Sequence, residues 1–589
     1  MFRINQCVKL VSQTLPKEWK TTPTTITFTR GGRFIAKAKR HPKQKPPQRG
    51  SLETKVFGEG KFAQLHNKTG TTKVETQINN FDQLKIFPIV RQAMLNEIRS
   101  QYNLKGRDAK DITIKPTVVQ TAAIRKLTQS RKVNPKLKID EDEYNAMTDA
   151  ERIQYELKYG NEVEKTRVFT IAAETGSGKT WSYLAPLLSK LKEDDMAMWK
   201  ADEQKYQDFK KAHQVRSMIL VPTNELVEQV YDVLKRVNQF ELPEGENLKV
   251  SENYQAFSDL EENRRLRLSI KKLNQGDPPV DLFRYVEEYG KIDVLVTTPG
   301  KITAFSKLEN INRPFRIFTN LRYCVLDEAD TLFDDSFEKN TTDVITHLPK
   351  LLELILVSAT IPKAFEKKIS KLFPDTSALI RVTTPSLHRI PRSIKVMTID
   401  ADESPYNGSK PRALGQAIYA ISNDSTEAGH VKRIIVFVNE KSEVDGIVES
   451  LITKYKVRPQ DICGVSGLVK INERRYMLEP FLNPAEKIGE SSDDSKVKIL
   501  VTTDLLARGL NFQSVRNVIL LGLPRSSVDL VHRLGRTGRM HQQGRVFIIL
   551  DKRDKKSWIK GLAGAVSKTP RNNNQFDIGN YLLILRNIM

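Results

Sequence analysis

One segment of the sequence has the residue types of a phosphate-binding loop. The run Ala-Glu-Thr-Gly-Ser-Gly-Lys-Thr at residues 173–180 follows an apolar, strand-like run at Val168–Ala172 and precedes a helical pattern. Glycines let backbone N–H groups approach phosphates at the amino end of a helix, while the lysine and the last threonine of such a loop reach the terminal phosphates and Mg²⁺. The nucleotide-binding residues expected here are Ala173, Glu174, Thr175, Gly176, Ser177, Gly178, Lys179 and Thr180.

A group of carboxylates follows a second apolar run. Tyr323–Leu326 has the pattern of a buried strand, and Asp327, Glu328 and Asp330 come directly after it. A carboxylate at the end of a parallel strand can lie beside the phosphate-binding loop. We expect Asp327 to bind Mg²⁺ together with Thr180, and Glu328 to orient or deprotonate an attacking water.

Three segments, taken in this order, are similar to a known family. The loop at 173–180, the Asp-Glu-Ala-Asp run at 327–330 and Ser-Ala-Thr at 358–360 resemble the DEAD-box RNA helicases of superfamily 2. The family's motif V matches residues 503–510, and its arginine motif matches residues 532–539. The resemblance implies a fold of the α/β class with two tandem RecA-like P-loop domains and parallel sheets, ATP and Mg²⁺ as cofactors, RNA as partner, and RNA-stimulated ATP hydrolysis.

Two arginines of the last motif stand three residues apart. Arg536 and Arg539 could both direct guanidinium groups at a γ-phosphate held by the first domain, and they resemble arginine fingers supplied within the chain. They reach that phosphate only when the two domains close, so hydrolysis should depend on the closed state that RNA favours. The coupling residues that the resemblance implies are Ser358, Thr360, His532 and Asp330.

A glutamine upstream of the loop has the position of the family's adenine contact. Lys-Pro-Thr-Val-Val-Gln at residues 115–120 resembles the Q motif, in which the Gln amide offers a donor and an acceptor to an adenine edge. Gln120 would then select ATP over GTP. Phe81 is a candidate for an aromatic that stacks on adenine, and an ordinary core phenylalanine is the alternative.

Several turns and basic residues resemble the family's contacts with the sugar-phosphate backbone, which carry no base code. Asn224 and Lys301 stand where the family has arginine, and Ile471 where it has glutamine. Asn511, expected to hold the nucleotide ribose, replaces an aspartate. The changes at Ile471 and Asn511 leave an RNA clamp with little turnover as an alternative to an unwinding enzyme. The expected RNA-binding residues are Pro222, Thr223, Thr298, Pro299, Gly300, Lys301, Arg474 and Thr503.

Short β-branched runs alternate with helical patterns in two series, which predicts βαβ units and two parallel sheets. The runs are 168–172, 217–221, 294–297, 323–326 and 354–357, then 434–438, 498–502, 518–521 and 546–550. Charged stretches at 131–165, 191–213, 241–290 and 484–496 read as solvated surface segments. The predicted organisation is a transit peptide and basic arm at 1–50, a linker and the region upstream of the Q motif at 51–110, an ATP-binding domain at 111–390, an inter-domain segment at 391–430, and a second domain with a basic extension at 431–589.

The charge of the chain favours a polyanionic partner. The formal net charge is +24, and no run approaches the length of about 18 apolar residues that a membrane span needs. Three cysteines, Cys7, Cys324 and Cys463, form no C-x-x-C pair, so neither a disulfide framework nor a thiolate zinc site is expected.

The amino-terminal segment has the chemistry of a mitochondrial address. Residues 1–50 hold twelve Lys and Arg against one acid, Glu18, and Ile4, Val8, Val11 and Leu15 follow a helical spacing. The alternative is a disordered basic arm that touches RNA or directs nuclear import. Joined to the helicase-like core, this segment resembles fungal mitochondrial members of the family. This resemblance implies action in the mitochondrial matrix on RNA, including ribosomal RNA, with ribosomal assembly proteins as partners in large-subunit assembly. We expect the chain to be a monomer.

Overall fold

The structure of the chain is a computed structural model that describes two domains, each built around one parallel β-sheet. The first domain lies within residues 78–383 and the second within residues 393–555. The predicted transit peptide and most of the predicted C-terminal extension lie outside the described residues. The described ranges are 78–103, 114–129, 148, 166–242, 265–308, 311–374, 379–383, 393–467, 469–483, 486–489, 495–504, 510–538 and 543–555.

The first sheet has seven parallel strands in the order β3-β4-β2-β5-β6-β1-β7. Parallel strands need crossover connections, which here are mostly helices, and helices on both faces bury the interior strands of the sheet, whereas the edge strands β3 and β7 are only partly buried. The carboxyl ends of β1, β5 and β6 therefore meet at one edge. The strands are β1 (Arg167–Ala172), β2 (Ser217–Leu220), β3 (Ile270–Leu273), β4 (Val294–Thr297), β5 (Tyr323–Asp327), β6 (Glu353–Ser358) and β7 (Leu379–Thr383).

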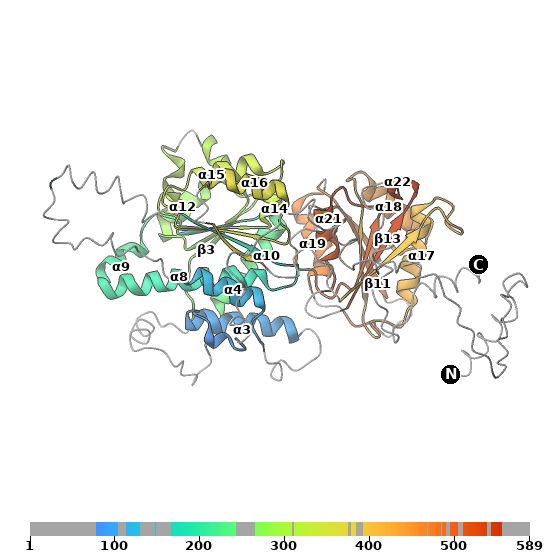
Figure 1. The fold of residues 1–589 in the computed structure, drawn as a ribbon, viewed down its shortest axis with the longest axis horizontal. Coiled ribbons are helices and arrows are strands. Elements are labelled where there is room, and N and C mark those ends of the chain that lie inside the picture. Colours follow the sequence, from blue (N-terminus) through green and yellow to red (C-terminus); the bar gives the residue numbers. More distant parts are fainter. Residues whose placement is uncertain are drawn as a thin grey trace, which may run out of the picture. The chain divides into compact units, whose positions relative to one another are not determined.

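Side chains alternate between two apolar layers on the faces of this sheet. Phe169 and Ile171 of β1 pack on one face with the first set of helices, whereas Val168 and Ala172 pack on the other. Figure 1 shows α3 and α4 on one side of the sheet and α15 and α16 on the other. The first set is α3 (Pro88–Asn103), α4 (Val118–Leu127), α8 (Lys179–Ala201) and α10 (Asn224–Gln239); the second is α12 (Val280–Tyr289), α14 (Ala329–Leu332), α15 (Glu338–Thr346) and α16 (Lys363–Leu372). Shorter elements are α9 (Glu203–Lys210), α13 (Pro299–Thr303) and the 3₁₀ turns η3 (Phe81–Gln83), η7 (Ala304–Lys307) and η8 (Pro314–Phe318).

The second sheet has six parallel strands in the order β10-β11-β9-β12-β13-β8. α17 and α18 cover one face, and α19 and α21 the other. The strands are β8 (Ile394–Asp400), β9 (Lys432–Phe437), β10 (Ile462–Val465), β11 (Val497–Thr502), β12 (Asn517–Leu521) and β13 (Gly544–Leu550). The helices are α17 (Lys410–Asn423), α18 (Glu443–Thr453), α19 (Ile471–Leu482), α21 (Ser527–Leu534), α22 (Lys552–Lys555) and the 3₁₀ turn η10 (Pro459–Asp461).

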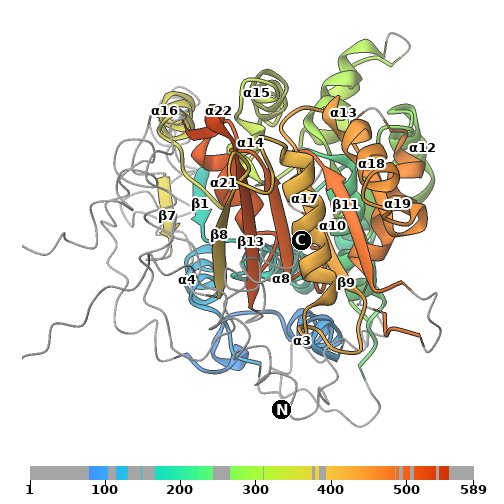
Figure 2. The ribbon, with the colours of Figure 1, turned by 90° about the vertical axis from the view of Figure 1, so that its right-hand side faces the viewer.

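The prediction that residues 391–430 form an inter-domain segment is wrong for most of that range. β8 pairs with β13 along its whole length, as Figure 2 shows, and α17 packs on the second sheet. Pro411 does not break α17, because it lies in the first turn of the helix, where proline is tolerated. The second domain therefore begins by Ile394.

The first domain also begins earlier than predicted. Phe81, Ile89 and Val90 are buried in the layer formed by α3, α4, α8 and α10, so the region upstream of residue 111 contributes to the core. Phe81, with 1% of its surface exposed, matches the core alternative rather than an open adenine-stacking position.

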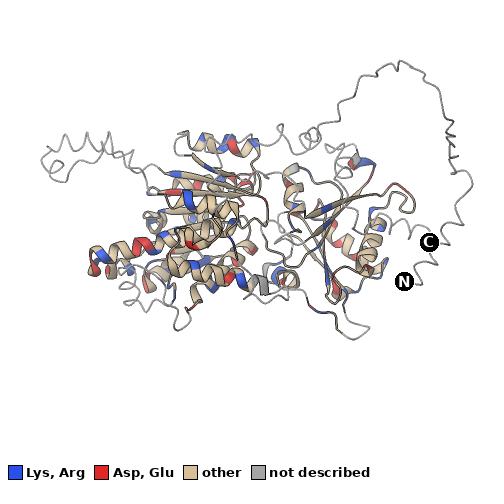
Figure 3. Cartoon of the chain, turned by 60° about the horizontal axis from the view of Figure 1, so that its bottom comes forward, with Lys and Arg blue, Asp and Glu red and all other residues tan. Residues whose placement is uncertain are grey.

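Charged side chains are distributed over both domains. Figure 3 shows Lys and Arg interspersed with Asp and Glu along the helices rather than gathered in one uninterrupted field. Among the described residues, no helix combines the length and the apolar composition needed to cross a membrane.

Candidate active site

The phosphate-binding loop joins β1 to α8. Gly176 and Gly178 have φ values of 79° and 89°, a left-handed conformation that favours glycine and lets α8 begin at Lys179. Lys179 Nζ donates to the carbonyls of Ala173 at 2.8 Å and Glu174 at 3.0 Å, so its charge lies inside the loop. The buried Ser177 Oγ has no hydrogen-bond partner among the described residues. Loop amides, a cation and an unsatisfied hydroxyl fit a phosphate chain.

Gln120 lies against this loop. Its Oε1 accepts from the Thr117 backbone N–H at 2.9 Å, its Nε2 donates to the Gly178 carbonyl at 3.3 Å, and Thr117 caps α4. A Cβ on Gly178 would come within 2.5 Å of the Gln120 Nε2, so only glycine allows this approach. The predicted adenine contact and the phosphate loop are therefore packed together.

Asp327 ends β5 at the same edge of the sheet. Its Oδ2 accepts from the Tyr183 hydroxyl at 3.0 Å, and its Oδ1 from the Glu328 backbone N–H at 2.9 Å. Burial, followed by the nearby charge of Glu328, raises the pKa of Asp327 to about 7, although the Tyr183 hydroxyl and Lys179 act in the opposite direction. Thr180, the other expected Mg²⁺ ligand, lies in the first turn of α8.

Glu328 adopts a backbone conformation that is rare for a side chain of its kind. Its φ is 53° and its ψ is 47°, at the residue that precedes α14. Such strain is maintained only where the surrounding structure imposes it, and it occurs preferentially at functional sites. The buried Glu328 Oε2 and His532 Nδ1 each lack a hydrogen-bond partner among the described residues and lie 3.9 Å apart.

The four predicted coupling residues form one network. Ser358 Oγ donates to the Thr360 carbonyl at 2.7 Å and accepts from the Thr360 N–H at 3.1 Å, and Thr360 Oγ1 donates to Asp330 Oδ2. His532 Nε2 lies 2.9 Å from the same Asp330 oxygen. A carboxylate only accepts, so Nε2 carries the proton. The network thus connects the first domain to α21 of the second.

Asp330, Glu328 and His532 are also close enough to one another to recruit a metal ion. The hydrogen bond between His532 and Asp330 accounts for their proximity, and the ligands expected for Mg²⁺ are Thr180 and Asp327 instead.

The arginine motif meets the phosphate-binding loop. A Cβ on Gly535 would lie 1.9 Å from Thr175 Oγ1, so the second domain approaches the loop there without a side chain between them. Arg536, which is 1% exposed, follows directly and donates to the carbonyls of Leu510 at 2.9 Å and His532 at 3.0 Å. Arg539 lies outside the described residues.

Two residues that contact the candidate active site, Tyr183 and Arg533, were not predicted from the sequence. Tyr183 contacts Asp327, as described above, and Arg533 forms a bidentate pair with Asp504 at 2.6 and 2.7 Å while also donating to Asn439 at 2.8 Å. Arg533 is 1% exposed, so this pair holds the start of the arginine motif rigidly against β11. Asp504 directly follows Thr503 in motif V, but only the fold shows the pairing.

The expected RNA contacts of the first domain lie at the starts of two helices. Pro222 and Thr223 follow β2, and Thr223 Oγ1 accepts from the Leu226 N–H at the start of α10. Lys301 Nζ donates to the carbonyls of Gln275 at 2.8 Å and Asp277 at 2.9 Å, an arrangement that favours holding this turn over a direct phosphate contact. At the start of the second helix, α13, Thr298 directly precedes the helix and Pro299 and Gly300 are its first two residues.

Two expected contacts of the second domain face the first domain instead of open solvent. Arg474, 8% exposed, pairs with Glu225 of α10 at 2.9 Å, which favours a role in joining the domains over the predicted RNA contact. The Asn511 N–H donates to Gln229 Oε1 at 2.5 Å. Thr503, which directly follows β11, is buried.

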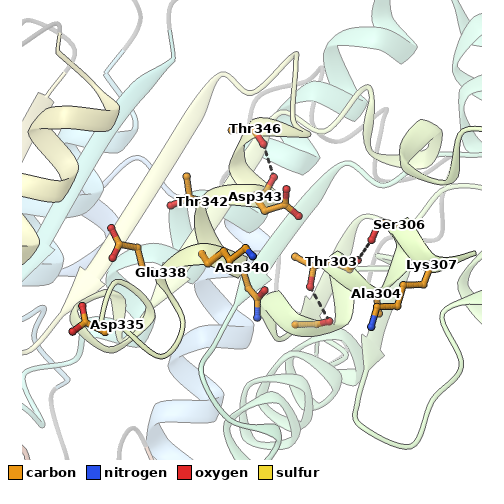
Figure 4. Close-up of a pocket in the computed structure, with 12 residues that line it drawn as sticks. Thr303, Ala304, Ser306, Lys307, Asp335, Glu338, Asn340, Thr342, Asp343 and Thr346 are labelled. Atoms are coloured by element: carbon orange, nitrogen blue, oxygen red, sulfur yellow. Dashed lines mark hydrogen bonds between the residues drawn. The ribbon is translucent and has the colours of Figure 1, made fainter.

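An open groove of 990 Å³ begins at Gly300 and runs between α13–η7 and α15 (Figure 4). Lys307 and Lys339 line it, are exposed, and pair with no acid among the described residues. Two of its acids, Asp335 and Glu338, share one cation, Lys368, at 3.2 and 2.6 Å, and a third acid, Asp343, also lines the groove. Most of the other lining side chains carry hydroxyl or amide groups, which together with the two lysines can bind a sugar-phosphate backbone.

Known proteins resemble this chain in sequence. The family description "DEAD/DEAH box helicase" matches residues 153–368, and "Helicase conserved C-terminal domain" matches residues 409–541. The protein named "ATP-dependent RNA helicase MRH4, mitochondrial" of Candida albicans is 67% identical over 534 residues, which cover 90% of this chain and 95% of that protein. The protein of the same name from Saccharomyces cerevisiae is 34% identical, covering 91% and 90%.

Solved structures share the fold. Saccharomyces cerevisiae Dbp5 bound to RNA and ADP BeF3 has a TM-score of 0.54 and 17% identity, covering 87% of this chain and 99% of that chain. Mss116p bound to single-stranded RNA and AMP-PNP has a TM-score of 0.52 and 18% identity, covering 86% of each. Together with the matched family descriptions and the high identity to the yeast proteins, the two parallel-sheet domains show that the chain belongs to the DEAD-box family of ATP-dependent RNA helicases.

Proposed function

We propose that the chain binds the RNA backbone across both domains and remodels or unwinds RNA locally when ATP draws the domains together. The observation that carries this proposal is a pair of contacts between the domains. His532 of the second domain hydrogen-bonds Asp330 of the first, and Gly535 of the second domain packs against Thr175 of the first. Through these contacts, a change at the nucleotide can bias the position of the second domain, and RNA bound across both can bias hydrolysis. Processive movement is not required.

ATP with Mg²⁺ fits the site. The loop residues 173–180 would hold the phosphates, and Thr180 and Asp327 supply the oxygen ligands that Mg²⁺ prefers. When bound, Mg²⁺ would neutralise phosphate charge. Glu328 would orient the attacking water and accept its proton, and Arg536 with Arg539 would stabilise charge on the γ-phosphate.

We also propose a place of action in the mitochondrial matrix, with mitochondrial RNA, including ribosomal RNA, as substrate, and a role as a monomer in large ribosomal subunit assembly. The basic segment 1–50 and the word "mitochondrial" in the relatives' names support the compartment. Ribosomal assembly proteins would then be partners.

An RNA clamp with little turnover is the second candidate. Ile471 stands where the family has glutamine, and Asn511, whose backbone N–H donates to Gln229 of the first domain, stands where the family has aspartate. Glu328 and Lys179 are nevertheless both present, and a clamp would not need the water-orienting carboxylate.

ATP hydrolysis by the full chain, measured without nucleic acid, with RNA and with DNA, separates these candidates. Stimulation by RNA alone supports the RNA helicase. RNA binding without stimulated turnover favours the clamp, and equal stimulation by DNA would extend the substrate to DNA.

The groove gives a prediction about RNA affinity. If RNA continues from Gly300 along the groove, replacing Lys307 and Lys339 together by glutamine removes two phosphate contacts. Each such contact to a single strand contributes about 0.7 to the slope of log affinity against log salt. We expect the slope to fall by about 1.4, measured by anisotropy of labelled RNA at several KCl concentrations.

The matched control is Lys200→Gln with Lys205→Gln. Both lysines are exposed, at the end of α8 and on α9, away from the strand ends that carry the site. An equal change of slope in this pair would contradict a specific role for the groove.

The contact at Gly535 gives a prediction about domain closure. Gly535 has φ of −71°, which alanine adopts freely, so Gly535→Ala should preserve the fold of the second domain. The added Cβ would overlap Thr175, and such misfits cost about 1–3 kcal/mol, or about a 5- to 150-fold loss of the closed state. RNA-stimulated turnover should fall within that range while ATP affinity in the absence of RNA is unchanged.

Gly446→Ala in α18 serves as the control, because a Cβ there meets nothing within 4 Å. Wild-type turnover in Gly535→Ala would mean that closure does not use this contact.

A further inference from the structure

A tyrosine in the interior of the first domain contacts the carboxylate expected to bind Mg²⁺. Tyr183 is fully buried, and its hydroxyl donates to Asp327 Oδ2 at 3.0 Å. A carboxylate offers only acceptors, so the tyrosine O–H is the donor of this hydrogen bond.

The two hydrogen bonds of Asp327 come from opposite parts of the site. One oxygen receives the Tyr183 hydroxyl from α8, and the other receives the Glu328 N–H from the chain that follows β5. A carboxylate held at both oxygens has lost its rotational freedom, and each oxygen still has a lone pair for a further ligand.

The first turns of α8 bring the relevant groups to one face. Lys179 and Tyr183 are four residues apart and Thr180 and Tyr183 three, spacings that place side chains on the same side of a helix. The Tyr183 ring packs in the same apolar layer as Leu184 and Leu187, so its position is fixed by the core. The hydroxyl therefore reaches Asp327 from a rigid support.

We infer that Tyr183 is a positioning residue, which fixes the Asp327 carboxylate in the orientation that binds Mg²⁺ in the ATP complex. The inference rests on the Mg²⁺ role of Asp327 proposed above. A ring that only filled space would need no hydroxyl, and phenylalanine would serve equally well. Partners that orient a metal ligand typically contribute about 10- to 100-fold to metal affinity.

The same strand provides a matched control. Tyr323, at the amino end of β5, donates its hydroxyl to Asp194 at 3.1 Å, whereas Asp327 stands at the carboxyl end of that strand. Tyr323→Phe and Tyr183→Phe thus each remove one hydroxyl from a tyrosine–aspartate pair, and only Tyr183→Phe touches the nucleotide site.

The test uses the full chain and a fluorescent ATP analogue. Mg²⁺ is titrated into protein with the analogue, and analogue affinity in EDTA and the thermal unfolding midpoint are measured alongside. We expect Tyr183→Phe to raise the Mg²⁺ concentration for half-maximal tightening about 10-fold, with EDTA affinity unchanged, and Tyr323→Phe to leave it at the wild-type value. An equal Mg²⁺ response in Tyr183→Phe and wild type would overturn the inference.

Asp327→Ala separates this inference from the proposal on which it rests. If wild type and Asp327→Ala respond to Mg²⁺ equally, the metal role of Asp327 fails. If Asp327→Ala alone weakens the response and Tyr183→Phe does not, only the positioning role of Tyr183 fails. In the Asp327→Ala background, Tyr183→Phe should cause no further loss, and a further loss of Mg²⁺ response there would show that Tyr183 does not act through Asp327.

Discussion

Arg536→Ala is expected to lower RNA-stimulated ATP turnover by about 10³-fold or more, the size of effect that arginine fingers have on phosphoryl transfer. Arg536 follows Gly535 at its contact with Thr175, and the carbonyls of Leu510 and His532 hold its guanidinium group in place. If Arg536 acts on the γ-phosphate as proposed, removing it takes away the positive charge that the second domain would place there. Turnover with saturating RNA, measured by phosphate release, gives the result directly.

Two further variants make the result interpretable. Arg536→Lys keeps the charge and loses the planar fork, so it should recover only part of the activity. Arg545→Ala removes another arginine of the same domain, one that pairs with Asp424 at the start of β13, and should lower thermal stability without lowering turnover. Equal loss of activity in Arg536→Ala and Arg545→Ala would point to damage of the fold instead of a missing finger.

Glu328→Gln is expected to lower RNA-stimulated turnover by about 10³-fold while ATP and RNA still bind, because a general base contributes about 10²- to 10⁴-fold. Glutamine has the size and shape of glutamate, so the network of Asp330, Thr360 and His532 should persist. The Glu328 Oε2 is buried and has no hydrogen-bond partner among the described residues, which fits an oxygen that acts on a bound water. ATP hydrolysis and ATP affinity should be measured on the same preparation.

The control is Glu353→Gln, which changes a buried glutamate at the amino end of β6. Glu353 pairs with Arg167 and Lys190, far along the strands from the catalytic edge. This variant should lose stability and keep turnover per folded molecule. If Glu328→Gln instead hydrolyses ATP as fast as wild type with RNA present, Glu328 is not the base. If the turnover of wild type and of Glu328→Gln is equally low, the RNA clamp gains support.

The sequence predicted the strands that lie inside the two sheets. The runs at 294–297 and 498–502 coincide with β4 and β11 to within a residue, because an interior parallel strand is buried on both faces and is almost wholly apolar. The strand before residues 173–180, the loop itself and the helix after it could likewise be predicted, because each depends on residues that are neighbours in the sequence. The order of motifs therefore sufficed to predict two RecA-like domains.

The four strands that were missed are the four edge strands, β3 and β7 of the first sheet and β10 and β8 of the second. An edge strand has one neighbour and is partly exposed, so its apolar signal is weak. β3 contains two lysines, and β8 alternates between buried and exposed residues. The predicted inter-domain segment failed for this reason, because only pairing with β13, far along the chain, identifies β8 as a strand.

The roles of individual side chains divide in the same way. Residue types within a motif were enough to predict roles for Lys179, Asp327, Glu328 and Arg536, because the chemistry of each is local. Partners from distant segments could be assigned only in the tertiary structure: Arg474 pairs with Glu225, Lys301 donates to the Gln275 carbonyl, and the Tyr183 hydroxyl donates to Asp327. The sequence by itself determined which chemistry this protein can perform, and the tertiary structure decided which side chains hold the reacting groups in place, since those contacts join residues far apart in the chain.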